Sequence, residues 1–256
     1  MNAALFSRRR HGDVLLIALV VFAFGCGAEP PRLYCGAGIR PPVEELVKQF
    51  EKEHGVTIKV DYAGSEVLLG RIKLSGKGDL YMPGDVHYVE LAEQADLIAA
   101  SEPVCYFVPV ILVQKGNRKR IKTLEDLTRA DVKVGLGDPK ACAIGRKASK
   151  IFIKNKIDEE KVNVKYRSAT VNNLGTQIKM DVLDAVIVWD ATAAYFAADA
   201  DVVTIPPEKN VISKVAVGVL KSAEYPELAR KFVDYVTSER GQEVFKKHHY
   251  TLAEPK

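Results

Sequence analysis

The sequence predicts an α/β protein built of two lobes. Short apolar runs alternate with amphipathic segments, as they do where strands and helices follow one another along a chain. The alternation occurs twice, and a long apolar stretch at 104–114 separates the two series. A second long apolar stretch, 211–219, follows the second series. Two series joined by two long strands indicate two lobes with two crossings, after which the C-terminal segment returns to the first lobe.

The first series is expected to contain three strands and three helices. The helix at 42–52 has the clearest periodicity, with Val43, Leu46, Val47 and Phe50 on one face. The other expected elements are strands 33–35, 56–61 and 79–82 and helices 67–74 and 86–95. Short connections between strands and helices favour right-handed crossovers and a largely parallel sheet covered on both faces.

The second series repeats this plan. Its expected strands are 132–135, 162–165 and 185–188, and its expected helices are 145–155, 173–179 and 191–198. Two further helices, 226–237 and 239–248, close the chain. We therefore expect residues 32–109 and 212–256 to form lobe 1 and residues 110–211 to form lobe 2.

The N-terminus has the features of an export signal. Three arginines, Arg8 to Arg10, precede an apolar run at 14–25, which is shorter than the about 20 residues of a membrane span. Gly25 directly before Cys26 resembles the lipobox of bacterial lipoproteins, although Phe24 is bulkier than usual. We predict a signal peptide over 1–25 and lipidation of Cys26, which places a membrane-anchored lipoprotein in the periplasm or at the cell surface. An ordinary signal peptide cut nearby and an uncleaved anchor are the alternatives.

Composition excludes several classes of function. Lys and Arg number 37 against 33 Asp and Glu, and three of the arginines lie in the leader. A nearly neutral chain gives no electrostatic argument for binding nucleic acid. No P-loop, nucleophile elbow or zinc-protease helix is present, so we expect neither an enzyme nor a cofactor.

The cysteines offer little chemistry. Beyond Cys26, the chain has Cys35, Cys105 and Cys142. Buried free thiols are the favoured interpretation, with a Cys35–Cys142 disulfide as the alternative. Cys142 is the one conceivable nucleophile, and no histidine lies near it in the sequence.

Small and hydroxyl-bearing residues occupy the turns that follow the expected strands. Examples are Gly36 to Gly38, Gly64-Ser65 and the turn that ends at Gly145. Ligands of open α/β sheets bind beyond the carboxyl ends of the strands. Unpaired N–H groups at helix starts form an anion site there without any lysine or arginine.

At this point the sequence resembles a known family, the periplasmic molybdate-binding proteins of ABC transporters, which have the type II periplasmic binding protein fold. The resemblance runs from about Leu33 to Phe245. It rests on Tyr62-Ala-Gly-Ser65 with Leu68 and Arg71-Ile72, Lys115-Gly-Asn117 with Leu124-Glu-Asp-Leu127, Gly137-Asp-Pro139 with Gly145, and Val186-Ile-Val-Trp189 with Ala191-Thr-Ala193. It implies a monomeric solute-binding protein of an ABC importer, which holds a molybdate- or tungstate-like oxyanion between its lobes and delivers it to a membrane permease.

The resemblance also implies site residues. Ser65 matches a ligand-binding serine, and Ile144 and Val171 match backbone donors. Gly38 stands where the family has a serine, and Trp189 stands where it has a tyrosine.

Two carboxylates adjoin these positions, Glu66 beside Ser65 and Asp190 beside Trp189. An ionised carboxylate near a dianion costs energy unless it is protonated, screened or turned away. The tungstate-binding branch uses carboxylates as extra ligands. A metal cation or another small anion that requires Glu66 or Asp190 is therefore an alternative ligand.

Further alternatives stay open from the residues alone. Tyr81, Asp85, His87 and Tyr88 could hold a hard or borderline metal ion, or Asp85 could cap a helix while Tyr88 packs. The chain could also be a receptor subunit that senses its ligand without transport. In either role, closure is expected to hinge near Val110 and Val211.

Overall fold

The structure, a computed structural model, describes residues 29–255. The predicted signal peptide and Cys26 lie outside the described residues. Among the described helices, none has the length and apolar character needed to cross a membrane.

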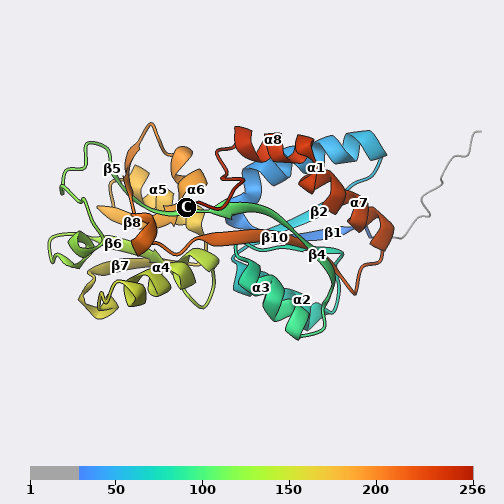
Figure 1. Cartoon of the computed structure of the whole chain (residues 1–256), viewed down its shortest axis with the longest axis horizontal. Helices are drawn as coiled ribbons and strands as arrows, with labels where there is room; N and C mark the ends of the chain where they lie inside the picture. Colours follow the sequence, from blue (N-terminus) through green and yellow to red (C-terminus); the bar gives the residue numbers. More distant parts are fainter. Residues whose placement is uncertain (1–28, 256) are drawn as a thin grey trace, which may run out of the picture.

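The first lobe is a five-stranded sheet in the order β2-β1-β3-β10-β4. Its strands are β1 (Arg32–Gly36), β2 (Lys59–Ala63), β3 (Leu80–Met82), β4 (Ile98–Phe107) and β10 (Ser213–Leu220). Helices α2 (Ser65–Ser75) and α3 (Val86–Gln94) cover one face, and α1 (Arg40–His54), α7 (Pro226–Thr237) and α8 (Glu239–Lys247) cover the other (Figure 1). A short 3-10 helix, η1 (Ala37–Ile39), joins β1 to α1.

The second lobe is a five-stranded sheet in the order β7-β6-β8-β5-β9. Its strands are β5 (Pro109–Gln114), β6 (Val134–Gly137), β7 (Val164–Ser168), β8 (Ala185–Trp189) and β9 (Ala200–Thr204), and its helices are α4 (Ala143–Lys154), α5 (Val171–Lys179) and α6 (Asp190–Ala194). Three more 3-10 helices lie in its loops, η2 (Glu125–Thr128), η3 (Glu159–Lys161) and η4 (Pro207–Lys209). The predicted α/β fold of two lobes is confirmed.

Each sheet is mixed, because the strands next to the crossings break the parallel order. In the first lobe β1 pairs in parallel with β2 and β3, while β10 runs antiparallel to β3 and β4. In the second lobe β6 pairs in parallel with β7 and β8, while β5 runs antiparallel to β8 and β9.

Two segments cross between the lobes and lie side by side (Figure 1). The stretch predicted as one strand at 104–114 is divided at Val108, because β4 ends in one sheet and β5 begins in the other. The second crossing is 210–212, just before β10. Asn210 ties the two crossings together, since its side-chain amide donates to the Pro109 carbonyl at 2.9 Å.

Several boundaries differ from the predicted ones. Helices α2 and α5 begin at Ser65 and Val171, two residues earlier than expected, because their first turns contain the small and polar residues of the preceding loops. Strand β9 was not predicted, since only its first residue is fully buried and its sequence carries a weak apolar pattern. The cysteines Cys35, Cys105 and Cys142 are buried free thiols, so the alternative of a Cys35–Cys142 disulfide is wrong.

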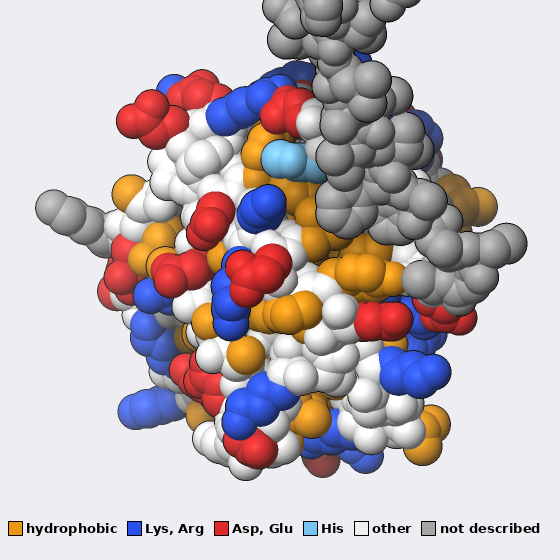
Figure 2. All heavy atoms as spheres, turned by 90° about the vertical axis from the view of Figure 1, so that its right-hand side faces the viewer, with side chains coloured by type: hydrophobic (Ala, Val, Ile, Leu, Met, Phe, Trp, Pro, Cys, Tyr) orange, Lys and Arg blue, Asp and Glu red, His pale blue; other side chains and the backbone are white. Residues whose placement is uncertain are grey.

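The end of the first lobe agrees with the nearly neutral composition. Figure 2 shows the end of the first lobe, where acidic and basic side chains are interspersed rather than gathered by sign. Because charges of both signs are mixed on this face, it gives no electrostatic reason to expect binding of one class of macromolecule.

Candidate functional site

A cavity of about 20 Å³ lies between the lobes, at the carboxyl ends of strands from both sheets. A volume of this size holds about one water molecule. Five of the seven predicted ligand-binding residues line it, namely Gly38, Ser65, Ile144, Val171 and Trp189. The other lining residues are Gly36, Ala37, Ala63, Gly64, Gly84, Phe107, Cys142, Ala143 and Thr170.

Besides the five-residue helix α6, whose N-cap residue is Trp189, three longer helices begin at this cavity without a side-chain cap. They are α2, α4 and α5, whose N-cap residues Gly64, Cys142 and Thr170 make no side-chain capping hydrogen bond. Helices α3 and α8 are capped by Asp85 and Ser238 in the usual way, whereas α1, α6 and α7 also lack a side-chain cap. The first-turn N–H groups of the three uncapped helices have no partner within their helices, and the helix dipoles make their surroundings favourable for an anion.

Ser65 is held as a hydrogen-bond donor toward the cavity. The residue is only 2% exposed, and its hydroxyl oxygen accepts the Gly84 N–H at 3.0 Å. The Tyr81 hydroxyl donates to the Ser65 carbonyl at 2.8 Å and fixes the backbone. Because a hydroxyl carries one proton and two lone pairs, the Ser65 proton remains available to a ligand.

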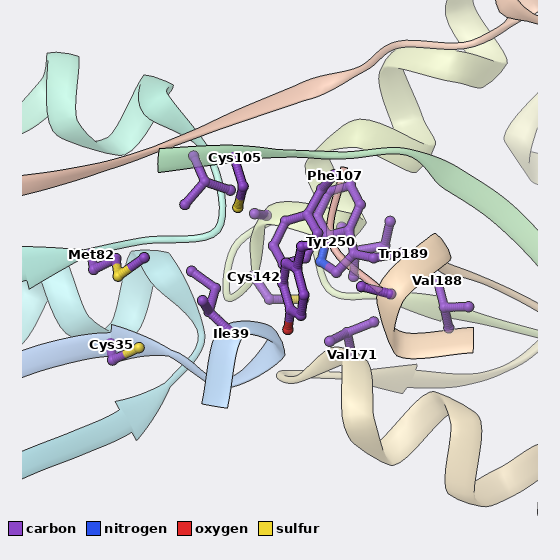
Figure 3. Packing of buried hydrophobic residues seen from close by; sticks show 14 of the residues in the cluster. Cys35, Ile39, Met82, Cys105, Phe107, Cys142, Val171, Val188, Trp189 and Tyr250 are labelled. Atoms are coloured by element: carbon purple, nitrogen blue, oxygen red, sulfur yellow. The ribbon is translucent and has the colours of Figure 1, made fainter. Parts of the chain in front are cut away.

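Trp189 and Gly38 fit together as a pair. The indole of Trp189 stacks on Phe107, with ring centroids 4.7 Å apart and planes inclined by 4°. A Cβ atom at Gly38 would lie 3.2 Å from Cδ1 of Trp189 and 3.0 Å from Cγ1 of Val171. The larger indole therefore occupies room that a side chain at position 38 would need, which gives one physical reason for both departures from the family pattern. Figure 3 shows Trp189 and Phe107 beside Tyr250, with Val171 and Cys142 on either side.

The two predicted carboxylates do not line the cavity. Glu66 is exposed in the first turn of α2. Asp190 accepts the Val108 N–H at 3.1 Å and the Thr251 hydroxyl at 2.9 Å, so it fastens the first crossing to the C-terminal tail. Burial raises the pKa of Asp190, although these hydrogen bonds act in the opposite direction. The structure thus turns both carboxylates away from the place where an anion would lie.

The predicted metal-binding alternative is also not assembled. Asp85 caps α3 by accepting the His87 N–H at 2.8 Å, and its carboxylate pairs with Lys147 of the other lobe at 2.7 Å. The Ser213 hydroxyl donates to the same carboxylate at 2.6 Å. Within residues 29–255 no group of three or more His, Cys, Asp or Glu side chains is arranged to hold a metal ion.

The Asp85–Lys147 pair is buried, with side chains 3% and 9% exposed. Burial acts to raise the pKa of Asp85, but the Lys147 charge and the hydrogen bonds from Lys147, Ser213 and His87 outweigh it and lower that pKa. Asp85 is therefore ionised at neutral pH and joins the two lobes. Sequence reasoning missed Lys147, because a lone lysine on a helix carries no signal of a partner in the other lobe.

Backbone contacts bring the lobes together around the cavity. A Cβ atom at Gly64 would lie 2.2 Å from the Ala141 carbonyl oxygen and 2.5 Å from that of Ala169. The side-chain amide of Asn172 in the second lobe donates to the backbone carbonyl of Ala37 in the first lobe at 3.1 Å. The lobes are thus closed on each other, and Gly64 is the point where their backbones approach most tightly among these contacts.

The chemistry of the cavity is that of a neutral donor shell. Backbone N–H groups, the Ser65 hydroxyl and the Trp189 indole are donors, and no lysine or arginine of residues 29–255 lines it. Cys142 also lines it, but burial raises the pKa of its thiol to about 11, so it remains protonated at neutral pH. The thiol donates to the Ser168 carbonyl at 3.4 Å, and its sulfur is only a weak acceptor for the N–H groups of Ile144 and Gly145 at the start of α4.

Comparison with known proteins places the chain in a family. Residues 31–251 match the family model described as bacterial extracellular solute-binding protein. A putative binding protein of Haemophilus influenzae is 29% identical over 235 residues, which cover 91% of this chain and 95% of that protein. The molybdate-binding protein ModA of Mycobacterium bovis is 25% identical over 226 residues, which cover 85% and 83% of the two chains.

Solved structures share the fold. The periplasmic molybdate-binding protein of Azotobacter vinelandii aligns with a TM-score of 0.74 at 13% identity, over 88% of this chain and 100% of that one. Iron-bound HitA of Pseudomonas aeruginosa aligns with a TM-score of 0.70 at 14% identity, over 88% and 89% of the two chains. At such identities the likeness concerns the fold and leaves the ligand to be argued from the cavity.

Proposed function

This chain belongs to the family of bacterial extracellular solute-binding proteins, and we propose that it captures a tetrahedral oxyanion of the molybdate or tungstate kind between its lobes. Proteins of this family act outside the cytoplasm and work with a membrane permease of an ABC transporter. On our proposal the closed form is the one that presents both lobes to that permease. The chain acts as a monomer in this scheme, since one chain supplies both halves of the cavity.

The observation that carries the proposal is the set of three uncapped helix starts at one cavity. Helices α2 and α4 come from different lobes, and α5 starts beside α4. N–H groups from both lobes surround a tetrahedral anion only when the lobes are closed, so binding and closure favour each other. The Ser65 proton adds a donor from the first lobe, and the Trp189 indole adds one from the second.

The same shell disfavours a cation. Among the described residues, the lining contributes donors and no carboxylate. Glu66 is exposed, and the Asp190 carboxylate accepts hydrogen bonds from Val108 and Thr251. A bare cation would meet the positive ends of three helix dipoles. We therefore favour the oxyanion over the metal ion that the two carboxylates would have served.

The cavity is small for its proposed ligand. Its volume of about 20 Å³ suits about one water molecule, whereas a tetrahedral oxyanion has four oxygen atoms around a central atom. Binding therefore requires the lobes to move apart slightly from this closed arrangement. We place the hinge of this movement at Val108 and 210–212, where the chain passes from one sheet to the other, close to the predicted hinge near Val110 and Val211.

A ligand screen tests this proposal directly. Trp189 is the only tryptophan of the chain and lines the cavity, so its fluorescence reports occupancy. Fluorescence titration and thermal shift should show saturable responses to molybdate and tungstate. Sulfate, phosphate, ferric and divalent metal ions serve as competitors. A response to metal ions alone would overturn the oxyanion proposal.

We propose as well that Cys26 carries the lipid that anchors the protein outside the cytoplasm. The support is the Gly25-Cys26 junction after an apolar run in the sequence. Mass spectrometry of the mature N-terminus should show a lipid-modified Cys26. The Cys26→Ala variant should be released from the membrane fraction, and a variant that stays there would contradict the assignment.

A further inference from the structure

Lys147 is a buried lysine of α4 that reaches from the second lobe to the first. Its ammonium lies 2.7 Å from the Asp85 carboxylate of the first lobe and donates to the Ile212 carbonyl of the second crossing at 2.9 Å. The residue does not line the cavity between the lobes. We propose that Lys147 is a positioning residue for oxyanion binding, which acts through Asp85 and Gly84 to hold the Ser65 hydroxyl toward the ligand. The inference rests on the proposed function and adds a residue to that site.

A series of contacts leads from Asp85 to Ser65. The Ser213 hydroxyl lies 2.6 Å from the Asp85 carboxylate and 3.0 Å from the Gly84 carbonyl oxygen, so it joins the ion pair to the turn between β3 and α3. The Gly84 N–H in turn donates to the Ser65 hydroxyl at 3.0 Å. A hydroxyl group can rotate, and the bond from Gly84 occupies one of its lone pairs, so this bond directs the remaining proton. The position of Gly84 therefore decides where the Ser65 proton points.

Gly84 also lies against the start of α4. A Cβ atom at Gly84 would lie 3.5 Å from Cβ of Ala143 and 3.6 Å from the Ser65 hydroxyl oxygen, and all three residues line the cavity. Lys147 follows Ala143 by about one helical turn. The helix that supplies N–H groups to the proposed anion site thus also holds, through Lys147, the turn that orients Ser65.

Helix α4 is itself fastened to the second crossing at two points. Lys147 donates to the Ile212 carbonyl, and Lys154 at the end of the helix donates to the Asn210 carbonyl at 2.7 Å. Because Asp85 belongs to the first lobe, its pairing with Lys147 fixes the distance between the donors of the two lobes. Binding sites depend on such distances to within about 0.5 Å, so loss of the pair should weaken the site without removing any ligand contact.

A double variant separates position from stability. Replacing both partners of a buried ion pair by uncharged residues is often neutral for stability, whereas removing one partner is not. Asp85→Asn together with Lys147→Met removes both charges and keeps a side-chain oxygen to accept the His87 N–H. We expect this double variant to fold and, in calorimetry, to bind molybdate about five- to tenfold more weakly, the worth of about one hydrogen bond.

Two further variants serve as controls for charge. Lys147→Arg keeps the positive charge and should retain most of the affinity. The exposed Lys179–Asp199 pair lies within the second lobe, with its charged atoms 3.0 Å apart. Lys179→Met together with Asp199→Asn therefore removes a matched pair away from the cavity and should leave molybdate binding unchanged.

A mutant cycle with Ser65→Ala distinguishes positioning from a structural role. If Lys147 acts through Ser65, the two charge-removing substitutions should weaken molybdate binding by less than about twofold once the Ser65 hydroxyl is absent. A general role in folding or closure would cost the same factor with or without that hydroxyl. Ser213→Ala leaves the ion pair in place and breaks its link to Gly84. It should weaken binding about three- to fivefold, again only while the Ser65 hydroxyl is present.

The outcomes separate this inference from the proposed function. If the unsubstituted protein binds neither molybdate nor tungstate, both fail together. If it binds them, and the substitutions have no effect or act additively with Ser65→Ala, the inference fails and the proposed function stands. If the double variant does not fold, the cycle of Ser213→Ala with Ser65→Ala decides the question alone.

Discussion

Ser65 is the side chain that our proposal places as a donor to the ligand. Its hydroxyl accepts from Gly84 and keeps its proton for a ligand. We expect Ser65→Ala to weaken oxyanion binding by about 1.5–3 kcal/mol, the worth of a hydrogen bond to a charged group. Titration calorimetry measures the change. Ser75→Ala at the other end of α2, where the hydroxyl bonds the Arg71 carbonyl, is the matched control, and equal affinities for the two variants would remove Ser65 from the site.

Gly38 and Trp189 should be coupled in a double-mutant cycle. Gly38→Ser alone introduces a side chain 3.0–3.2 Å from Val171 and Trp189, so we expect it to weaken binding. Trp189→Tyr makes room beside position 38, and the double variant should recover part of the lost affinity. Contacting residues show interaction energies of about 0.5–3 kcal/mol. Strictly additive effects on the measured dissociation constants would mean that the two residues do not share space.

The sequence motifs predicted which residues lie near the cavity better than they predicted where each side chain points. Gly38, Ser65, Ile144, Val171 and Trp189 were placed at the cavity by motif alone, because motifs fix which turn follows which strand. The same reasoning placed Asp190 there, yet its carboxylate turns to Val108 and Thr251. Those partners are far from Asp190 in the sequence, so no local pattern could have indicated them.

At the scale of elements, the starts of the helices matter more than their lengths. Apolar periodicity detects the middle of a helix and misses a first turn built of Ser65-Glu66 or of Val171-Asn172. Those first turns carry the N–H groups of the proposed anion site. The division of 104–114 into β4 and β5 was likewise hidden, because both halves are apolar and only the partner strands distinguish them.

Helices α3 and α4 are joined across the lobes by the Asp85–Lys147 pair, which predicts a pH dependence of stability. An unfolded aspartate has a pKa of about 3.9, and the folded pKa of Asp85 is lowered. The pair therefore stabilises the fold fully above that unfolded value, and the stabilisation is lost as the pH falls through the folded pKa.

The Asp85→Asn variant tests that expectation. It leaves Lys147 buried without its partner and should cost about 3–5 kcal/mol of unfolding free energy at pH 7. The difference from the unsubstituted protein should shrink as the pH falls below about 4, because Asp85 takes up a proton first in the unfolded state and in the folded state only at its lowered pKa. Urea unfolding at several pH values measures this, and a difference that stays constant down to pH 3 would contradict the assigned role of the carboxylate.

For the molecule as a whole, closure depends on how closely two backbones approach. Gly64 packs against the Ala141 and Ala169 carbonyls of the other lobe, where a Cβ atom would lie at 2.2 and 2.5 Å. Contacts this short cannot be relieved by a side-chain rotation, because both partners are backbone atoms. A residue with any side chain at position 64 must hold the lobes apart.

We therefore expect Gly64→Ala to keep the protein open and to weaken ligand binding at least about tenfold, since the N–H groups of α4 and α5 can no longer reach an anion held at α2. Small-angle scattering should show a larger radius of gyration that the ligand does not reduce. Gly70→Ala is the matched control, because it lies on the same helix with no atom within 4 Å of its Cβ position. That control should bind and compact normally while stabilising α2 by about 1 kcal/mol. If Gly64→Ala compacts with ligand as Gly70→Ala does, closure does not depend on the contacts at position 64. The cavity between the lobes is then not supported as the binding site.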